Sequence, residues 1–240
     1  MVKTPEWSGD MSVCIAAISD RSGNARLVSI VDRKVSSGEF SNEDATIKSK
    51  WFHPNWYALF AGNDISPCIP ISMAVGTEIA GRENTFELVR STFEKCYQKY
   101  LSNLAASKCL GRWGLTMEKF LETGRKKFGP DTFDGLCHQI EQVKLQCRFL
   151  VCGFDGTGQP HLFTLQNPGY AEVKDTPGYW AIGNGDFAAM SMLESVGIDL
   201  RYTPNKLKRL AIAALALTIA LWMVLEALRD TVLQLPDENS

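Results

Sequence analysis

Histidines and closely spaced cysteines are scarce in this chain of 240 residues. Its three histidines, His53, His138 and His161, are far apart in sequence and lack the short spacings that metal ligands usually have. Seven cysteines are present, but no two of them form the C-x-x-C pair of zinc or thiol–disulfide sites. The chain also lacks a phosphate-binding loop, and no G-x-G-x-x-G segment follows a predicted strand. We therefore expect no metal and no cofactor.

An excess of one charge sign is also missing, because 25 Lys and Arg residues face 27 Asp and Glu residues. This balance argues against nucleic acid as a partner, which usually requires a strongly basic face. The first ten residues are polar and do not resemble the basic and then apolar leader of a secreted protein. Together with an odd number of cysteines, this favours a reduced cytoplasmic protein whose cysteines are mostly small buried hydrophobic residues.

The longest uncharged apolar segment covers 16 residues, Leu210–Leu225, and ends at Glu226. A helix that crosses a membrane usually needs about 20 such residues. The length of the segment therefore favours a helix buried in the core. A membrane-tethered chain remains the alternative.

Apolar periodicity and turn residues predict a run of strands, a run of helices, and then strands and helices again. The predicted strands cover residues 12–18, 26–31, 45–52, 56–60, 147–154, 161–165, 170–173 and 179–182, and the predicted helices cover 85–106, 115–128, 133–143, 187–196 and a last segment from Pro204. This order is unlike the strict alternation of a parallel α/β fold. It predicts an α+β protein in which two packed antiparallel sheets carry helices on both outer faces.

The segments SVCIAAI, VDRKVSSG, IKSKW and ALFAGND resemble, in this order, the beginning of proteasome β-type subunits and their bacterial relatives. Further along, FLVCGFDGTGQPHLFTL resembles the central hairpin of that family, and AIGNGDFAAMSML resembles its turn into a helix. The resemblance spans about residues 12–200. It implies the four-layer αββα sandwich of the N-terminal-nucleophile (Ntn) hydrolases. One domain would cover 12–232, after an extension, propeptide or wrongly assigned start at 1–11 and before a tail at 233–240.

The same resemblance implies a catalytic site at Ser12, Asp32, Lys48 and Gly62, whose spacings match the family pattern. Ser12 would be the nucleophile, and its own α-amine, which titrates near neutrality, would be the base. The Lys48 ammonium would favour ionisation of the hydroxyl and keep the amine neutral, and Asp32 would hold Lys48. The backbone N–H of Gly62 would stabilise the oxyanion.

Two further positions follow from the resemblance. Asn184 stands where relatives often carry a serine, and it would orient the terminal amine. Asp230, in the segment Arg229-Asp230-Thr231, matches an aspartate that supports the nucleophile in relatives. The glycine-rich turn that follows in the family is replaced here by Val-Leu-Gln-Leu and a Pro-containing tail.

A free Ser12 requires the removal of Met11 and everything before it. Two routes lead to it: either translation starts at Met11 and that methionine is excised, or residues 1–11 are a self-cleaved propeptide. The family usually has glycine in place of Met11. These observations predict an Ntn hydrolase that cleaves a peptide or amide bond, within a homo-oligomer. The alternative is a catalytically inactive proteasome-like subunit with a structural or binding role.

Overall fold

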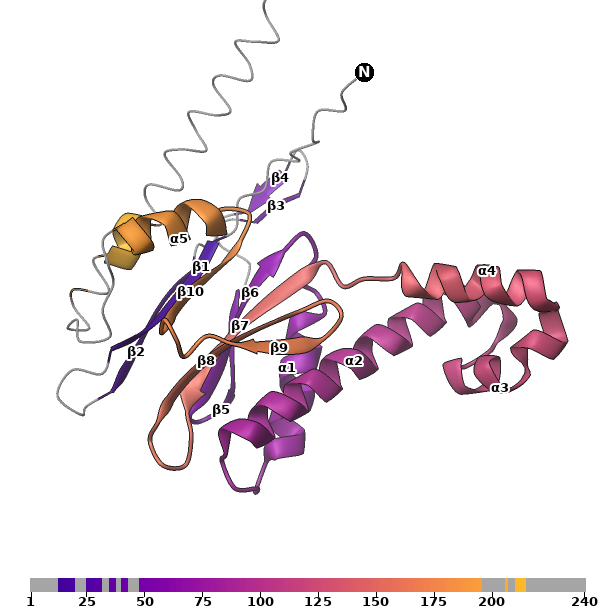
Figure 1. Ribbon diagram of the computed structural model, residues 1–240, viewed down its shortest axis with the longest axis horizontal. Helices are drawn as coiled ribbons and strands as arrows, with labels where there is room; N and C mark the ends of the chain where they lie inside the picture. Colours follow the sequence, from indigo (N-terminus) through magenta and orange to yellow (C-terminus); the bar gives the residue numbers. More distant parts are fainter. Residues whose placement is uncertain are drawn as a thin grey trace, which may run out of the picture.

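Two antiparallel β-sheets form the centre of the molecule in the computed structural model, which describes residues 13–19, 25–31, 35–37, 40–42, 48–195, 206 and 210–214 (Figure 1). The three-stranded sheet has the order β10-β1-β2, formed by Tyr179–Gly183, Val13–Ser19 and Arg26–Val31. The five-stranded sheet has the order β5-β6-β7-β8-β9, formed by Ser49–His53, Trp56–Gly62, Cys147–Phe154, Pro160–Gln166 and Tyr170–Val173. A short separate hairpin consists of β3 (Val35–Ser37) and β4 (Phe40–Asn42).

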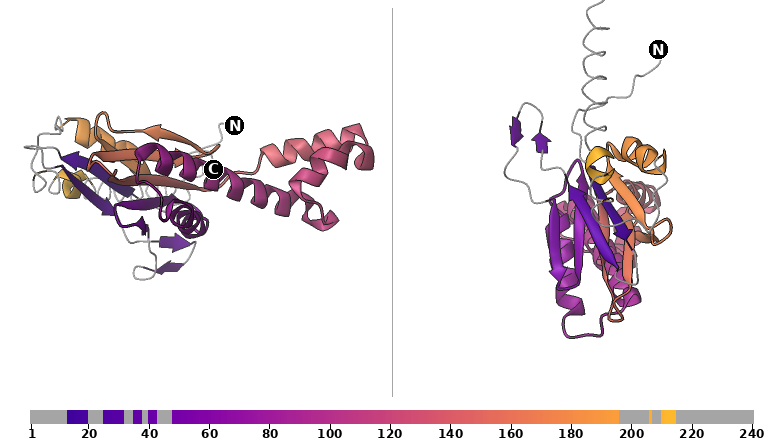
Figure 2. Two further views of the ribbon diagram at one scale, coloured as in Figure 1. Left: turned by 90° about the horizontal axis from the view of Figure 1, so that it is seen from below. Right: turned by 90° about the vertical axis from the view of Figure 1, so that its left-hand side faces the viewer.

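Helices cover the outer faces of both sheets. Helices α1 (Cys68–Ile79) and α2 (Phe86–Leu110) pack on the five-stranded sheet, and α5 (Asp186–Ser195) packs on the three-stranded sheet. The side view shows the two sheets face to face between these helical layers (Figure 2). The described residues therefore form the predicted α+β sandwich with the layer order αββα.

Strand β1 shows why the sequence produces this layering. All seven of its residues are buried, because the strand has a helix on one side and a sheet on the other. Val13, Ile15 and Ala17 pack toward α5, whereas Cys14 and Ala16 pack between the sheets. Successive side chains of a strand point to opposite faces, so only a continuous apolar run satisfies both environments.

Helix α1 was not predicted from the periodicity, because Pro70 and Gly76 lie inside it. Pro70 is the third residue of the helix, where the missing N–H has no partner within the helix in any case. A side chain at Gly76 would overlap the carbonyl oxygen of Phe52, so glycine allows α1 to lie directly against β5. Packing of Ile71 and Val75 on the sheet outweighs the weak helical preference of the segment.

The helix boundaries agree with the capping signals in one case and differ in another. The sequence offers Asn84 or Thr85 as the cap of α2, and the structure uses Thr85, whose hydroxyl accepts a hydrogen bond from the N–H of Leu88 (3.3 Å). The helix predicted from Phe133 instead begins at Pro130, which occupies the first helical turn rather than the preceding gap.

The C-terminal half of α2 extends away from the sandwich and carries a helical arm (Figures 1 and 2). The arm consists of the short 3-10 helix at Gly111–Trp113, α3 (Met117–Phe128) and α4 (Pro130–Glu141). It has an apolar cluster of its own around Leu110, Phe120 and Leu136, separate from the clusters of the sandwich.

Candidate active site

One end of the three-stranded sheet gathers the strand ends on which the predicted site depends. Val13, the first residue of β1, pairs with Gly183, the last residue of β10. Cys14 pairs with Val31, the last residue of β2. Ser12, Asp32 and Asp230 lie outside the described residues, as do 1–11 and 233–240. Ser12 and Asp32 directly adjoin these paired strand ends in sequence.

The five-stranded sheet contributes Gly62 to the same end. Gly62 is the last residue of β6 and pairs with Cys147, the first residue of β7. The two sheets meet here, because the Cys14 thiol of β1 donates a hydrogen bond to the carbonyl of Phe60 in β6 (3.1 Å). The geometry thus brings Gly62 and the paired ends of β1, β2 and β10 to one end of the sandwich.

Lys48 lies immediately before β5 and is 3% exposed. Its carbonyl accepts the backbone N–H of Phe60 (2.8 Å), which ties Lys48 to β6 two residues before Gly62. Lysine is rarely buried without a partner for its charge, and Lys48 does interact with neighbouring groups. Lys48 differs in this respect from Lys50, whose side chain is only partly buried.

Gly62 has a φ of +139°, a conformation that residues with a side chain rarely adopt. A Cβ atom at this position would overlap the carbonyl oxygen of Gln146. The N–H of Asp64 donates to that same carbonyl (3.2 Å), so the chain turns sharply after Gly62. Glycine is therefore required here by both backbone conformation and space.

Asn184 follows Gly183, which has a φ of +115° and ends β10. It is exposed, and it precedes helix α5 by two residues. The structure therefore places three predicted residues, Lys48, Gly62 and Asn184, on segments of the sandwich whose strand ends are linked. Their catalytic roles stay a prediction.

An ion pair that the sequence did not predict joins the five-stranded sheet to helix α5 at this end. The Arg148 guanidinium of β7 donates to the Asp186 carboxylate (2.8 Å). Asp186 is the first residue of α5. The signal in the sequence is a single charge, Arg148, at the start of the otherwise apolar strand β7.

Buried thiols near the site are structural rather than nucleophilic. Burial, assisted by the neighbouring Cys147 thiol, raises the pKa of Cys68 far above its ordinary value. Burial also raises the pKa of Cys152 to about 12. Because the thiolate is the reactive form, these side chains stay protonated near neutral pH. All seven cysteines are free, and five of them are buried, as the sequence predicted.

The family model described as "Proteasome subunit" matches residues 137–221, a range that includes β7 to β10 and α5. This match, together with the αββα sandwich, supports a proteasome-like member of the Ntn hydrolase superfamily. The search of curated proteins found no match to it.

The matched range contains Asn184, Arg148 and Asp186 but ends before Asp230 and begins after Gly62. The four-layer sandwich extends the proteasome-like architecture to the N-terminal strands β1, β2, β5 and β6. In the part of the chain that the structure describes, no helix is long and apolar enough to cross a membrane. Most of the apolar segment Leu210–Leu225 lies outside the described residues.

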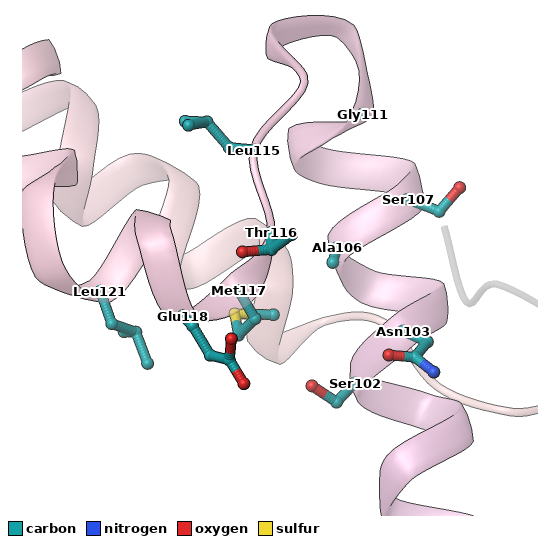
Figure 3. A pocket seen from close by; sticks show the side chains of 10 residues that line it. All are labelled: Ser102, Asn103, Ala106, Ser107, Gly111, Leu115, Thr116, Met117, Glu118 and Leu121. Atoms are coloured by element: carbon teal, nitrogen blue, oxygen red, sulfur yellow. The ribbon is translucent and has the colours of Figure 1, made fainter.

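A pocket of about 450 Å³ lies in the arm of this proteasome-like protein, away from the predicted site (Figure 3). It opens between α2 and α3, and Glu118 is the one ionisable side chain among its lining residues. Ser102, Asn103 and Leu121 also line it. None of the six predicted catalytic residues contributes to the pocket, so it adds nothing to the chemistry of that site.

A histidine and two aspartates gather at the opposite end of the five-stranded sheet, where β8 begins. His161 Nδ1 lies 2.7 Å from Asp175 Oδ2, and His161 Nε2 lies 3.5 Å from Asp155 Oδ2. The imidazole stacks on Phe86 with 4.3 Å between ring centroids. Within the described ranges, no group of three or more His, Cys, Asp or Glu side chains has the arrangement of a metal site. The cluster joins the β7–β8 turn to the connection after β9.

His161 makes the stability of the protein depend on pH. Burial alone would lower the pKa of His161, but Asp175 and then Asp155 outweigh it, so the pKa is raised. The stabilisation by protonated His161 is complete below about pH 6.5, its ordinary unfolded value, and is lost as the pH rises through the higher folded value. Between pH 6 and 8 we expect the midpoint of urea unfolding to fall in the wild type.

The measurement compares His161→Gln with His138→Gln, which changes an exposed histidine of α4. We expect the pH dependence to become flatter in His161→Gln and to stay at the wild-type slope in His138→Gln. Equal slopes for all three proteins would show that the carboxylates do not hold the proton on His161.

Proposed function

We propose that this proteasome-like chain is an Ntn hydrolase that cleaves a peptide or amide bond, with Ser12 as its N-terminal nucleophile after removal of residues 1–11. The observation that carries the proposal is the meeting of strand ends at one end of the sandwich. Val13 pairs with Gly183 there, Cys14 pairs with Val31, and the thiol of Cys14 contacts β6 just before Gly62. Ser12, Asp32 and Asn184 each adjoin one of these paired residues in sequence.

In the proposed reaction the Ser12 hydroxyl oxygen attacks the carbonyl carbon while the free α-amine of Ser12 takes the hydroxyl proton. The buried Lys48 ammonium, balanced by Asp32, stabilises the negative charge that develops. The N–H of Gly62 donates to the oxyanion, and Asn184 and Asp230 orient the terminal amine and the nucleophile. The C–N bond then breaks, the leaving amine receives the proton, and water hydrolyses the resulting ester.

The proposal also includes the remaining sequence predictions. Residues 12–232 would form one domain, and the substrate and a homo-oligomeric assembly would be the partners. A cytoplasmic location is consistent with seven free cysteines in the chain. No cofactor takes part in the proposed chemistry.

The test is the intact mass and N-terminal sequence of the full chain, produced without an N-terminal tag, followed by treatment with a β-lactone. A hydroxyl nucleophile opens the lactone to an ester, so we expect a mature chain that starts at Ser12 and gains the mass of one probe. Peptide mapping should place the ester on Ser12, and Ser12→Ala should not be labelled. A chain that retains Met11, or a mature chain without the adduct, would overturn the proposal.

The second candidate is a catalytically inactive proteasome-like subunit. It is favoured by Met11, because this residue stands where self-processing relatives carry glycine. The same mass measurement separates the two candidates, since the inactive subunit needs no cleavage before Ser12. A chain that retains Met11 and forms a defined oligomer in analytical ultracentrifugation would support the second candidate.

A further inference from the structure

We propose that Arg148 and Asp186 are positioning residues that fix the turn of Asn184 against the five-stranded sheet, and so set the separation between the nucleophile strand and the oxyanion turn. The inference rests on the proposed function for its effect on rate. Its structural part, the fixing of the turn, is measurable without catalysis.

The need for such a contact follows from the division of the site between two sheets. The nucleophile would extend from β1 in the three-stranded sheet, whereas Gly62 belongs to β6 in the five-stranded sheet. Among the described residues no backbone ladder joins the two sheets, so side-chain contacts set their spacing there. A displacement of about 1 Å between reacting groups costs as much as about 100-fold in rate.

The ion pair lies where it controls this spacing. Arg148 pairs with Ala61, the neighbour of Gly62, so its backbone belongs to the oxyanion side of the site. Asp186 is two residues after Asn184, and Gly183 pairs with Val13 on the nucleophile side. The 2.8 Å contact between Arg148 and Asp186 therefore links the end of β6, where Gly62 lies, to the turn at Asn184.

The start of helix α5 holds the Asp186 side of the ion pair in place. Asp186 is the first residue of α5, and a carboxylate at a helix N-terminus interacts favourably with the helix dipole. The N–H of Ala189 donates to the carbonyl of Gly185 (3.1 Å), so α5 starts directly at the end of the turn. The Arg148 and Asp186 side chains are 46% and 33% exposed, which makes a large effect on global stability unexpected. A local effect on the turn is what the geometry supports.

The test uses the full chain with Arg148→Gln, Asp186→Asn and the charge reversal Arg148→Asp/Asp186→Arg. The matched control is Lys95→Gln, which breaks the 3.0 Å ion pair between Lys95 and Glu78 on the outer helical layer. β-Lactone acylation of Ser12 is followed by intact mass over a range of probe concentrations. Amide hydrogen exchange is measured over residues 183–187.

We expect both single variants to slow the maximal acylation rate about tenfold, with the half-saturating probe concentration changed less than twofold. The charge reversal should restore at least half of the lost rate, and Lys95→Gln should behave as the wild type. Exchange over 183–187 should become faster in the single variants only. Wild-type exchange and acylation in Arg148→Gln would overturn the inference.

The two proposals fail in different ways. If wild-type Ser12 is not acylated, the proposed function is wrong, and the exchange of residues 183–187 alone decides whether the ion pair fixes the turn. If wild-type Ser12 is acylated and Arg148→Gln matches it in both measurements, the enzyme assignment stands and the positioning role is wrong.

Discussion

Lys48→Met should slow acylation of Ser12 by the β-lactone at least about 1,000-fold, the largest effect that we expect from a residue outside the nucleophile. Lys48 is buried, and the hydrogen bond from Phe60 to its carbonyl ties it to β6, so little water is present to take over the role of its ammonium. Charge interactions are stronger in such a water-poor site than at the surface. Methionine keeps the apolar length of the side chain and removes only the charge.

The control is Lys50→Met, two residues further along the chain in β5. Lys50 pairs with Ala58 and is more exposed than Lys48, so its removal should change the acylation rate less than twofold. Far-ultraviolet circular dichroism and urea unfolding check that both variants are folded. An acylation rate of Lys48→Met close to that of Lys50→Met would show that Lys48 is a structural lysine.

Gly62→Ala should reduce the free energy of unfolding by about 3–5 kcal/mol, because two separate costs add at this position. The φ of +139° strains any residue with a Cβ atom, and the added methyl group would overlap the carbonyl oxygen of Gln146. β6 and β7 would have to separate at the point where the chain turns. Urea unfolding measures the loss.

The matched control is Gly111→Ala, at a glycine without positive φ and without any atom within 4 Å of the added Cβ. We expect this change to alter the free energy of unfolding by less than about 1 kcal/mol. If Gly62→Ala were as stable as Gly111→Ala, the turn after β6 would be more adaptable than its backbone geometry indicates. Its use as a rigid oxyanion donor would then be in doubt.

Local patterns in the sequence were sufficient for most elements of the sandwich. The uninterrupted apolar run of β1 predicted a strand, and Asp155 and Gly156 predicted the β7–β8 turn. Helix α1 was missed because its packing against β5 and the five-stranded sheet outweighs the effects of Pro70 and Gly76. That packing depends on residues far away in sequence, which periodicity within one segment does not contain.

For the candidate site, the resemblance to a family selected Lys48 and Gly62. The fold then placed Lys48 immediately before β5 and Gly62 at the end of the adjoining strand β6. The resemblance to a family supplied their roles, which stay predictions. The Arg148–Asp186 ion pair was beyond sequence reasoning, because its members are 38 residues apart and belong to different layers. A charge at the start of an apolar strand indicates an unusual environment but does not identify its partner.

The sequence by itself determined the α+β class, the alternation of runs of strands with runs of helices, and the absence of a charge excess or metal-ligand spacing. These properties depend on composition and on neighbours within a few residues, which the chain carries directly. Only the tertiary structure decided which strand ends meet, which of two nearby lysines is buried, and that Arg148 joins β7 to helix α5. Such properties depend on how distant segments pack, because burial and ion pairing are set by all the layers together.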